Sequence, residues 1–203
     1  YLEIVEAEPH KHLRSSAQYL VDLFDFYGTT ELQHPTGNTT RYKLFDMPFN
    51  QGENKVAGQE KIQEQIYLCL KNFARQGQTN KLILLHGPNG SAKSSMVRCM
   101  MSAMEDYSKR EDGALYTFNW IFPNKTPGKE QIGFGENDAI ASTSETFAFL
   151  NAEDIDARIP SEMHDHPLFL IPCKERMDFI DSAFPEGLEG ETKFQLSHYL
   201  RFG

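Results

Sequence analysis

The feature that most constrains the fold is a glycine-containing loop between an apolar run and a helical pattern. Its sequence is Gly87-Pro-Asn-Gly-Ser-Ala-Lys-Ser-Ser95. The run Lys81–His86 before it is short and apolar, which is typical of a buried, parallel strand. Lys93–Tyr107 after it has a methionine-rich face at helical spacing. A strand, a glycine loop and a helix in direct succession predict an α/β domain.

This order matches a Walker A loop, of the form G-x-x-x-x-G-K-[ST], except that Ala92 replaces the second glycine. In such a loop, backbone N–H groups form a concave anion site at a helix N-terminus. We expect Lys93 to reach the β- and γ-phosphates of ATP and the Ser94 hydroxyl to bind Mg²⁺. We expect Ala92 to be tolerated through a helical backbone angle. The predicted phosphate-binding residues are Gly87, Pro88, Asn89, Gly90, Ser91, Ala92, Lys93, Ser94 and Ser95.

Other interpretations of these residues remain open. The loop can be a glycine turn that only joins a strand to a helix. Ser91 and Lys93 also have the residue types of a nucleophile pair, but no third partner is in view. Val56 and Gly58, just before a predicted helix, are candidates for an adenine pocket or for a simple helix lead-in.

Hydrophobic periodicity organises the rest of the chain. It predicts helices at Ser15–Tyr27, Gln59–Phe73 and Cys173–Phe184, a second strand at Leu115–Ile121, and a polar, turn-rich stretch at Gly28–Thr40. We therefore expect a small N-terminal helical segment over residues 1–41. The predicted fold of residues 42–203 is a three-layer α/β P-loop NTPase of the AAA-like kind.

Two further motifs resemble functional sites but lack a residue or a spacing that such sites need. Met163-His-Asp-His166 contains metal-ligand residue types, but its spacing does not close a site, which favours a structural loop. Leu168–Ile171 is apolar enough for the acidic strand of an NTPase, yet Pro172 and Cys173 follow it in place of an acid. No acidic strand, sensor or arginine finger is evident, so the sequence predicts a nucleotide-binding half-site with unknown catalytic residues.

Charge and cysteine content limit the partners. The formal net charge is −9, which argues against broad nucleic-acid binding because phosphates need cations. No apolar run approaches the length of a membrane span. The cysteines are 3 in number and scattered, which favours a reducing cytoplasm over a disulfide framework.

An ordered set of segments resembles the PrkA family, bacterial serine protein kinases with an N-terminal AAA-type ATPase module. It comprises Tyr42–Asp46, Val56–Gly58, the loop Gly87–Ser95, Gly113–Phe118 and Met163–Pro172, whose string Met-His-Asp-His-Pro-Leu-Phe-Leu-Ile-Pro is the most specific. The resemblance implies an ATP-binding, AAA-like module that forms homo-oligomers in the bacterial cytoplasm. It gives no residue here a protein kinase role, and it implies a module incomplete at its C-terminal end. The sequence does not say whether Gly203 is the natural end.

The stretch Pro123–Pro160 has no recognised counterpart in that family and resembles an insertion of unknown role. One alternative is a small P-loop kinase in which this stretch is a lid with catalytic arginines, although it contains Arg158 alone. The other is a nucleotide-gated or nucleotide-dead protein-interaction module, of which Ala92 would be a symptom. The protein substrate and the oligomer size are not predicted.

Overall fold

The structure, a computed structural model, describes residues 1–34, 37–52, 55–76, 82–123 and 152–183. These residues form two compact units. The first runs from Tyr1 to Leu115 and resumes at Leu168, and the second is Tyr116–Pro167. The units do not divide at residue 41, because the predicted N-terminal segment shares a hydrophobic core with the residues that follow it.

The helices of the first unit largely follow the predicted pattern. They are α1 (Leu2–Ala7), α2 (Pro9–His12), α3 (Ser16–Tyr27), α4 (Glu60–Gln76), α5 (Lys93–Ser108) and α6 (Cys173–Ala183). The predictions of α3, α4, α5 and α6 are confirmed, whereas α1 and α2 were not predicted. Ser15 begins α3 as its N-cap, with a side chain that accepts from the Gln18 amide at 3.2 Å. Over the described ranges, no helix has the length and apolarity needed to cross a bilayer.

The strands form two antiparallel hairpins. β1 (Thr29–His34) pairs with β2 (Gly37–Tyr42) from Thr29 opposite Tyr42 to His34 opposite Gly37. The stretch Gly28–Thr40, predicted to be polar and turn-rich, is instead mostly a hairpin, since threonines on both strands suit extended pairing. In the second unit, β3 (Asn119–Pro123) pairs with β4 (Ile155–Pro160).

The predicted parallel sheet is not among the described residues. Each sheet found there has 2 strands and is antiparallel. The predicted strand Leu115–Ile121 overlaps β3 only from Asn119 onward. Most of Pro123–Pro160 lies outside the described residues, so its role as an insertion stays a prediction, as does the three-layer fold.

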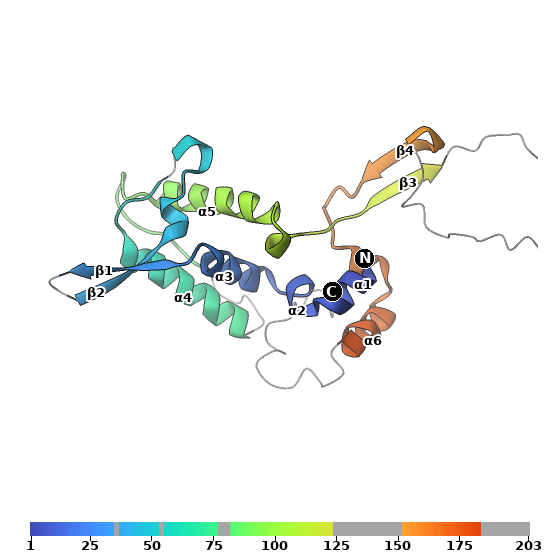
Figure 1. Ribbon diagram of the computed structural model, residues 1–203, viewed down its shortest axis with the longest axis horizontal. Coiled ribbons are helices and arrows are strands. Elements are labelled where there is room, and N and C mark those ends of the chain that lie inside the picture. Colours follow the sequence, from blue (N-terminus) through green and yellow to red (C-terminus); the bar gives the residue numbers. More distant parts are fainter. Residues whose placement is uncertain (35–36, 53–54, 77–81, 124–151, 184–203) are drawn as a thin grey trace, which may run out of the picture. The chain divides into compact units, whose positions relative to one another are not determined.

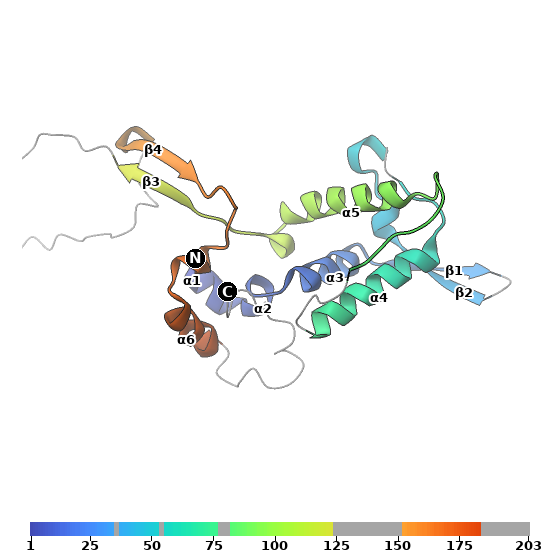
Figure 2. The same cartoon turned by 180° about the vertical axis from the view of Figure 1, so that it is seen from behind.

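The core of the first unit is built on α3, which lies between α4 and α5 (Figures 1 and 2). Phe24 of α3 is fully buried, and its ring centroid lies 5.3 Å from that of Tyr42 on β2. The rings of Phe45 and Tyr67 follow at 5.8 and 5.6 Å. Aromatic pairs at these distances add to the burial energy, so this cluster fixes α3, α4 and the chain after β2 together. A smaller cluster joins α1 and α6 through Val5, Leu13, Leu168 and Ile180.

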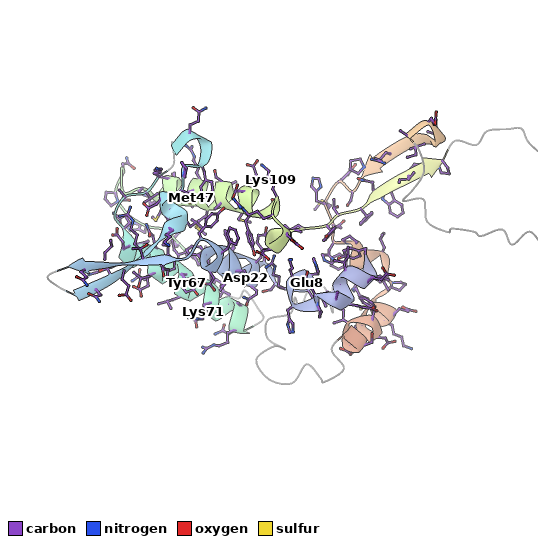
Figure 3. The ribbon with its side chains drawn as sticks, in the orientation of Figure 1. Glu8, Asp22, Met47, Tyr67, Lys71 and Lys109 are labelled. Carbon is purple, nitrogen blue, oxygen red and sulfur yellow. The ribbon has the colours of Figure 1, made fainter. Side chains whose placement is uncertain are left out.

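Arg14 ties the N-terminal turn to α3 and to the end of α5. Its side chain is only 6% exposed, and Nη1 lies 2.6 Å from the Oδ2 atom of Asp22, which Figure 3 labels on α3. Nη2 donates to the Asp112 carbonyl at 2.8 Å. The guanidinium also lies over the Tyr19 ring at 4.6 Å. The Arg14 guanidinium thus pairs with a carboxylate, donates to a carbonyl and lies on an aromatic ring at the same time.

Replacing Arg14 by Ala should lower the free energy of unfolding by about 2–4 kcal/mol, because it leaves the Asp22 carboxylate without its close cation. Urea unfolding followed by circular dichroism measures the change. Arg75→Ala is the matched control, since Arg75 is exposed on α4 and bonds Asn72 at 3.5 Å. Equal losses in the two variants would contradict the role given to Arg14.

His12 should make stability fall in acid. It is 8% exposed, and burial, followed by the charge of Lys11, lowers the pKa of its imidazole from 6.5. Because the unfolded state then binds a proton more readily than the folded state, the contribution of neutral His12 to stability is fully present above pH 6.5. It is lost as the pH falls through the folded-state pKa. The slope that His12 contributes is at most about 1.4 kcal/mol per pH unit.

Urea unfolding between pH 7.5 and pH 5 should therefore show a smaller loss of stability in His12→Gln than in the unchanged protein. His10→Gln, at an exposed position on the same helix, should keep the original pH dependence. An identical pH dependence in the unchanged protein and in His12→Gln would contradict this prediction.

Candidate phosphate-binding loop

The loop lies between a segment without regular secondary structure and the start of α5. This segment is residues 82–88, Asn89 and Gly90 form a turn, and α5 begins at Lys93. Ile83 and Leu85 pack against the core, whereas Leu82 and Leu84 are 86% and 77% exposed. The prediction of a buried strand is wrong for the described residues 82–86, because no neighbouring strand among the described residues covers them or pairs with them.

The two glycines of the loop suit its geometry for different reasons. Gly90 has a φ of +82°, which a residue with a Cβ adopts only at a cost. A Cβ at Gly87 would lie 3.0 Å from the Ser91 hydroxyl oxygen, closer than such atoms normally approach. The loop therefore turns tightly at Gly90 and folds the Ser91 side chain back onto Gly87.

Ala92 departs from the expectation made from the sequence. It is the N-cap of α5 with φ 60° and ψ 15°, a left-handed conformation and not a helical one. An L-residue with a Cβ pays roughly 1–2 kcal/mol for this conformation, and glycine does not. A glycine at this position would adopt the same backbone conformation without that cost, whereas Ala92 adopts it under strain.

Lys93 closes the loop on itself. Its ammonium Nζ donates to the carbonyl oxygens of Gly87 at 2.8 Å and Pro88 at 2.6 Å. It also lies 3.0 Å from the Ser91 hydroxyl oxygen. An ammonium has three protons to donate, so these acceptors satisfy all of them. The charge is consequently fixed directly above the loop backbone.

The start of α5 presents unused backbone donors next to this charge. The first backbone hydrogen bond of α5 runs from the Met96 amide to the carbonyl of the N-cap residue, Ala92, at 2.9 Å. Within the part of the chain that the structure describes, no acceptor bonds the amides of Lys93, Ser94 or Ser95. Unpaired first-turn amides and the positive end of the helix dipole together favour an anion.

A groove of about 840 Å³ adjoins the loop in the first unit. This volume falls within the range of about 300–1,000 Å³ that small-molecule sites occupy. The loop contributes Gly87, Pro88, Ser91 and Lys93 to its wall, α4 contributes Ile62, Ile66 and Phe73, and α5 contributes Met96. Residues 82–86 and polar side chains of α4, such as Asn72 and Arg75, complete the lining, so the groove combines charged, polar and apolar groups.

The residues proposed for an adenine pocket lie elsewhere. Val56 is 2% exposed in the core, and its amide donates to the Phe45 carbonyl at 3.1 Å. The Gly58 carbonyl accepts from Nε2 of Gln63 at 3.1 Å. Neither residue lines the groove. These contacts fit the helix lead-in, and the adenine pocket at Val56 and Gly58 stays an untested prediction.

The segment 163–166 forms a turn in the second unit. The His164 amide donates to the Ser161 carbonyl at 3.1 Å, and the Asp165 amide donates to the Ser161 hydroxyl at 3.3 Å. In the described ranges, no group of three or more His, Cys, Asp or Glu side chains could hold a metal ion. The geometry fits the structural loop favoured by the sequence.

Comparisons with protein-family models, with curated proteins and with solved structures gave no match. The geometry of the loop is therefore the basis of the functional proposal. The bond from Lys93 to Ser91 brings together the two side chains that the sequence offered, as an open alternative, for a nucleophile pair. A serine two residues before the lysine was the available signal, but spacing alone does not show that the two side chains fold toward each other.

Changing Ala92 to Gly should raise the free energy of unfolding by up to about 1 kcal/mol, because the relief of the left-handed strain outweighs the chain entropy that glycine adds to the unfolded state. Ala103→Gly on the same helix is the matched control and should lower stability by about 1 kcal/mol or more, because Ala103 is buried and helical. Opposite signs in urea unfolding support the assignment, and a loss in both variants would contradict it.

Proposed function

We propose that this chain binds ATP with Mg²⁺ through the loop Gly87–Ser95. The observation that carries the proposal is the Lys93 ammonium, held 2.8 Å from the Gly87 carbonyl and 2.6 Å from the Pro88 carbonyl at the N-terminus of α5. Phosphate oxygens would accept from this cation and from the amides of Lys93, Ser94 and Ser95. Such charge-assisted bonds are about twice as strong as neutral ones.

Ser94 is suited to the metal. Its side chain is exposed on the first turn of α5, directly after Lys93. A hydroxyl oxygen is the hard donor that Mg²⁺ accepts, and the ion keeps most of its remaining positions for phosphate and water. When bound, the ion would neutralise phosphate charge, while Ser94 fixes its position relative to the loop.

The groove beside the loop gives the rest of the nucleotide a place to lie. Ile66, Phe73 and Met96 give part of its lining an apolar character, which suits the face of a base. Lys93 and Ser91 of the loop line the same groove. In this arrangement the phosphates would lie at the loop and the base against the apolar side chains.

In the same proposal, the chain is the AAA-like module of an oligomeric, cytoplasmic protein of the PrkA type. It is supported by the ordered segments of the sequence and by a loop that leads directly into a 16-residue helix. ATP hydrolysis and serine kinase activity belong to the full-length protein in this proposal, and no residue of this chain is assigned to either.

A second function is favoured by a different observation. Leu82 and Leu84, on the segment that leads into the loop, are 86% and 77% exposed, and Ala92 in the loop is strained, as expected for an interaction module that has lost or gates nucleotide binding. Such a module would bury this apolar segment against a partner protein. Nucleotide binding by the isolated chain distinguishes the two functions.

Isothermal titration calorimetry of the 203-residue chain with ATP and with ADP, in the presence and absence of Mg²⁺, tests the proposal. We expect saturable binding, strengthened by Mg²⁺, and a loss of roughly tenfold to a hundredfold in affinity for Lys93→Ala.

The matched control is Lys109→Ala at the other end of α5, labelled in Figure 3, where the ammonium bonds Glu105 at 2.9 Å. This variant should bind as the unchanged chain does. No binding by any of the three chains would contradict the proposal and favour the interaction module.

A further inference from the structure

We infer that the Ser91 hydroxyl occupies the place on the Lys93 ammonium that a ligand phosphate takes, and that it competes with the ligand for that place. This inference rests on the proposed function. Ser91 Oγ lies 3.0 Å from Lys93 Nζ, and the two other acceptors of that ammonium are backbone carbonyls. All three protons are in use, so a phosphate oxygen must displace one acceptor.

Of the three acceptors, the hydroxyl is the one that can leave. The carbonyls of Gly87 and Pro88 belong to the loop backbone, and moving either would change the loop that binds the anion. The Ser91 side chain needs only a rotation about χ1 between staggered positions. In the present rotamer the Ser91 hydroxyl lies beside Gly87, which has no Cβ to crowd it.

The bonds that Ser91 gives up are inexpensive to lose. Its hydroxyl donates to the Pro88 carbonyl at 2.8 Å, and that carbonyl also accepts from Lys93 at 2.6 Å and from the Ser91 amide at 3.4 Å. A carbonyl oxygen has two lone pairs, so one of these donors is in excess. When the hydroxyl rotates away, Pro88 keeps two donors and remains satisfied.

The exchange favours anions of high charge. The hydroxyl is a neutral acceptor, and a phosphate oxygen forms a shorter and stronger bond to the same ammonium. A neutral ligand group gains nothing by displacing Ser91. The Ser91–Lys93 contact therefore lowers the affinity for every ligand that must displace the hydroxyl. It favours polyphosphates over uncharged ligands that fit the groove.

Calorimetry with ATP and with inorganic triphosphate, at a fixed Mg²⁺ concentration, tests this competition. Ser91→Ala removes the competing acceptor, and we expect affinity for both ligands to rise about threefold to tenfold, the worth of one exchanged hydrogen bond. Ser91→Thr keeps the hydroxyl and should restore the original affinity.

The control is Ser108→Ala, which makes the same change on α5, where the hydroxyl bonds the Glu105 carbonyl at 3.0 Å. It should leave affinity unchanged. General damage to the loop lowers affinity, so a rise separates competition from a purely structural role. Equal or weaker binding by Ser91→Ala, beside normal binding by the unchanged chain, overturns the inference alone. Absence of binding by every chain overturns the proposed function and the inference together.

Discussion

The burial of Phe24 is the interaction on which the candidate site depends. This fully buried ring contacts Tyr42, Phe45 and Tyr67, which lie on β2, on the 3-10 turn Lys43–Asp46 and on α4. The same turn accepts a bond from the Cys99 thiol of α5 to the Leu44 carbonyl at 3.4 Å. Burial raises the pKa of that thiol to about 11, so it stays a protonated donor at neutral pH. The aromatic contacts and this thiol bond together fix both helices that border the groove.

The loop places a cation in an otherwise acidic protein. The formal net charge of −9 repels anions at long range, but salt screens exposed charges beyond about 10 Å. Close to the loop, the fixed Lys93 ammonium and the first-turn amides of α5 determine the local field. The cost is local strain at Ala92, which has a positive φ angle and carries a Cβ. The three bonds to Lys93 help to offset that strain and hold the loop in its shape without a ligand.

The sequence predicted the helices well because their apolar residues repeat at helical spacing and pack into one core. It predicted the loop because strand-like, glycine-rich and helical patterns follow one another directly. It failed at Gly28–Thr40, where polar threonines gave no alternation that distinguishes a hairpin from a loop. It also failed at Ala92, since residue type alone does not report the sign of φ. The burial of residues 82–86 depends on neighbouring strands, which local pattern does not supply.

The most direct test of anion binding at the loop is a titration of the isotopically labelled chain with Mg²⁺ and ATP, followed by amide chemical shifts. Direct bonds from the first turn of α5 predict that the largest, saturable shifts belong to the amides of Gly90 and Ala92 through Ser95. Amides near the end of α5, such as those of Lys109 and Arg110, should shift little. Large shifts elsewhere with an unchanged loop, or no saturable shift in the loop at all, would contradict phosphate binding there.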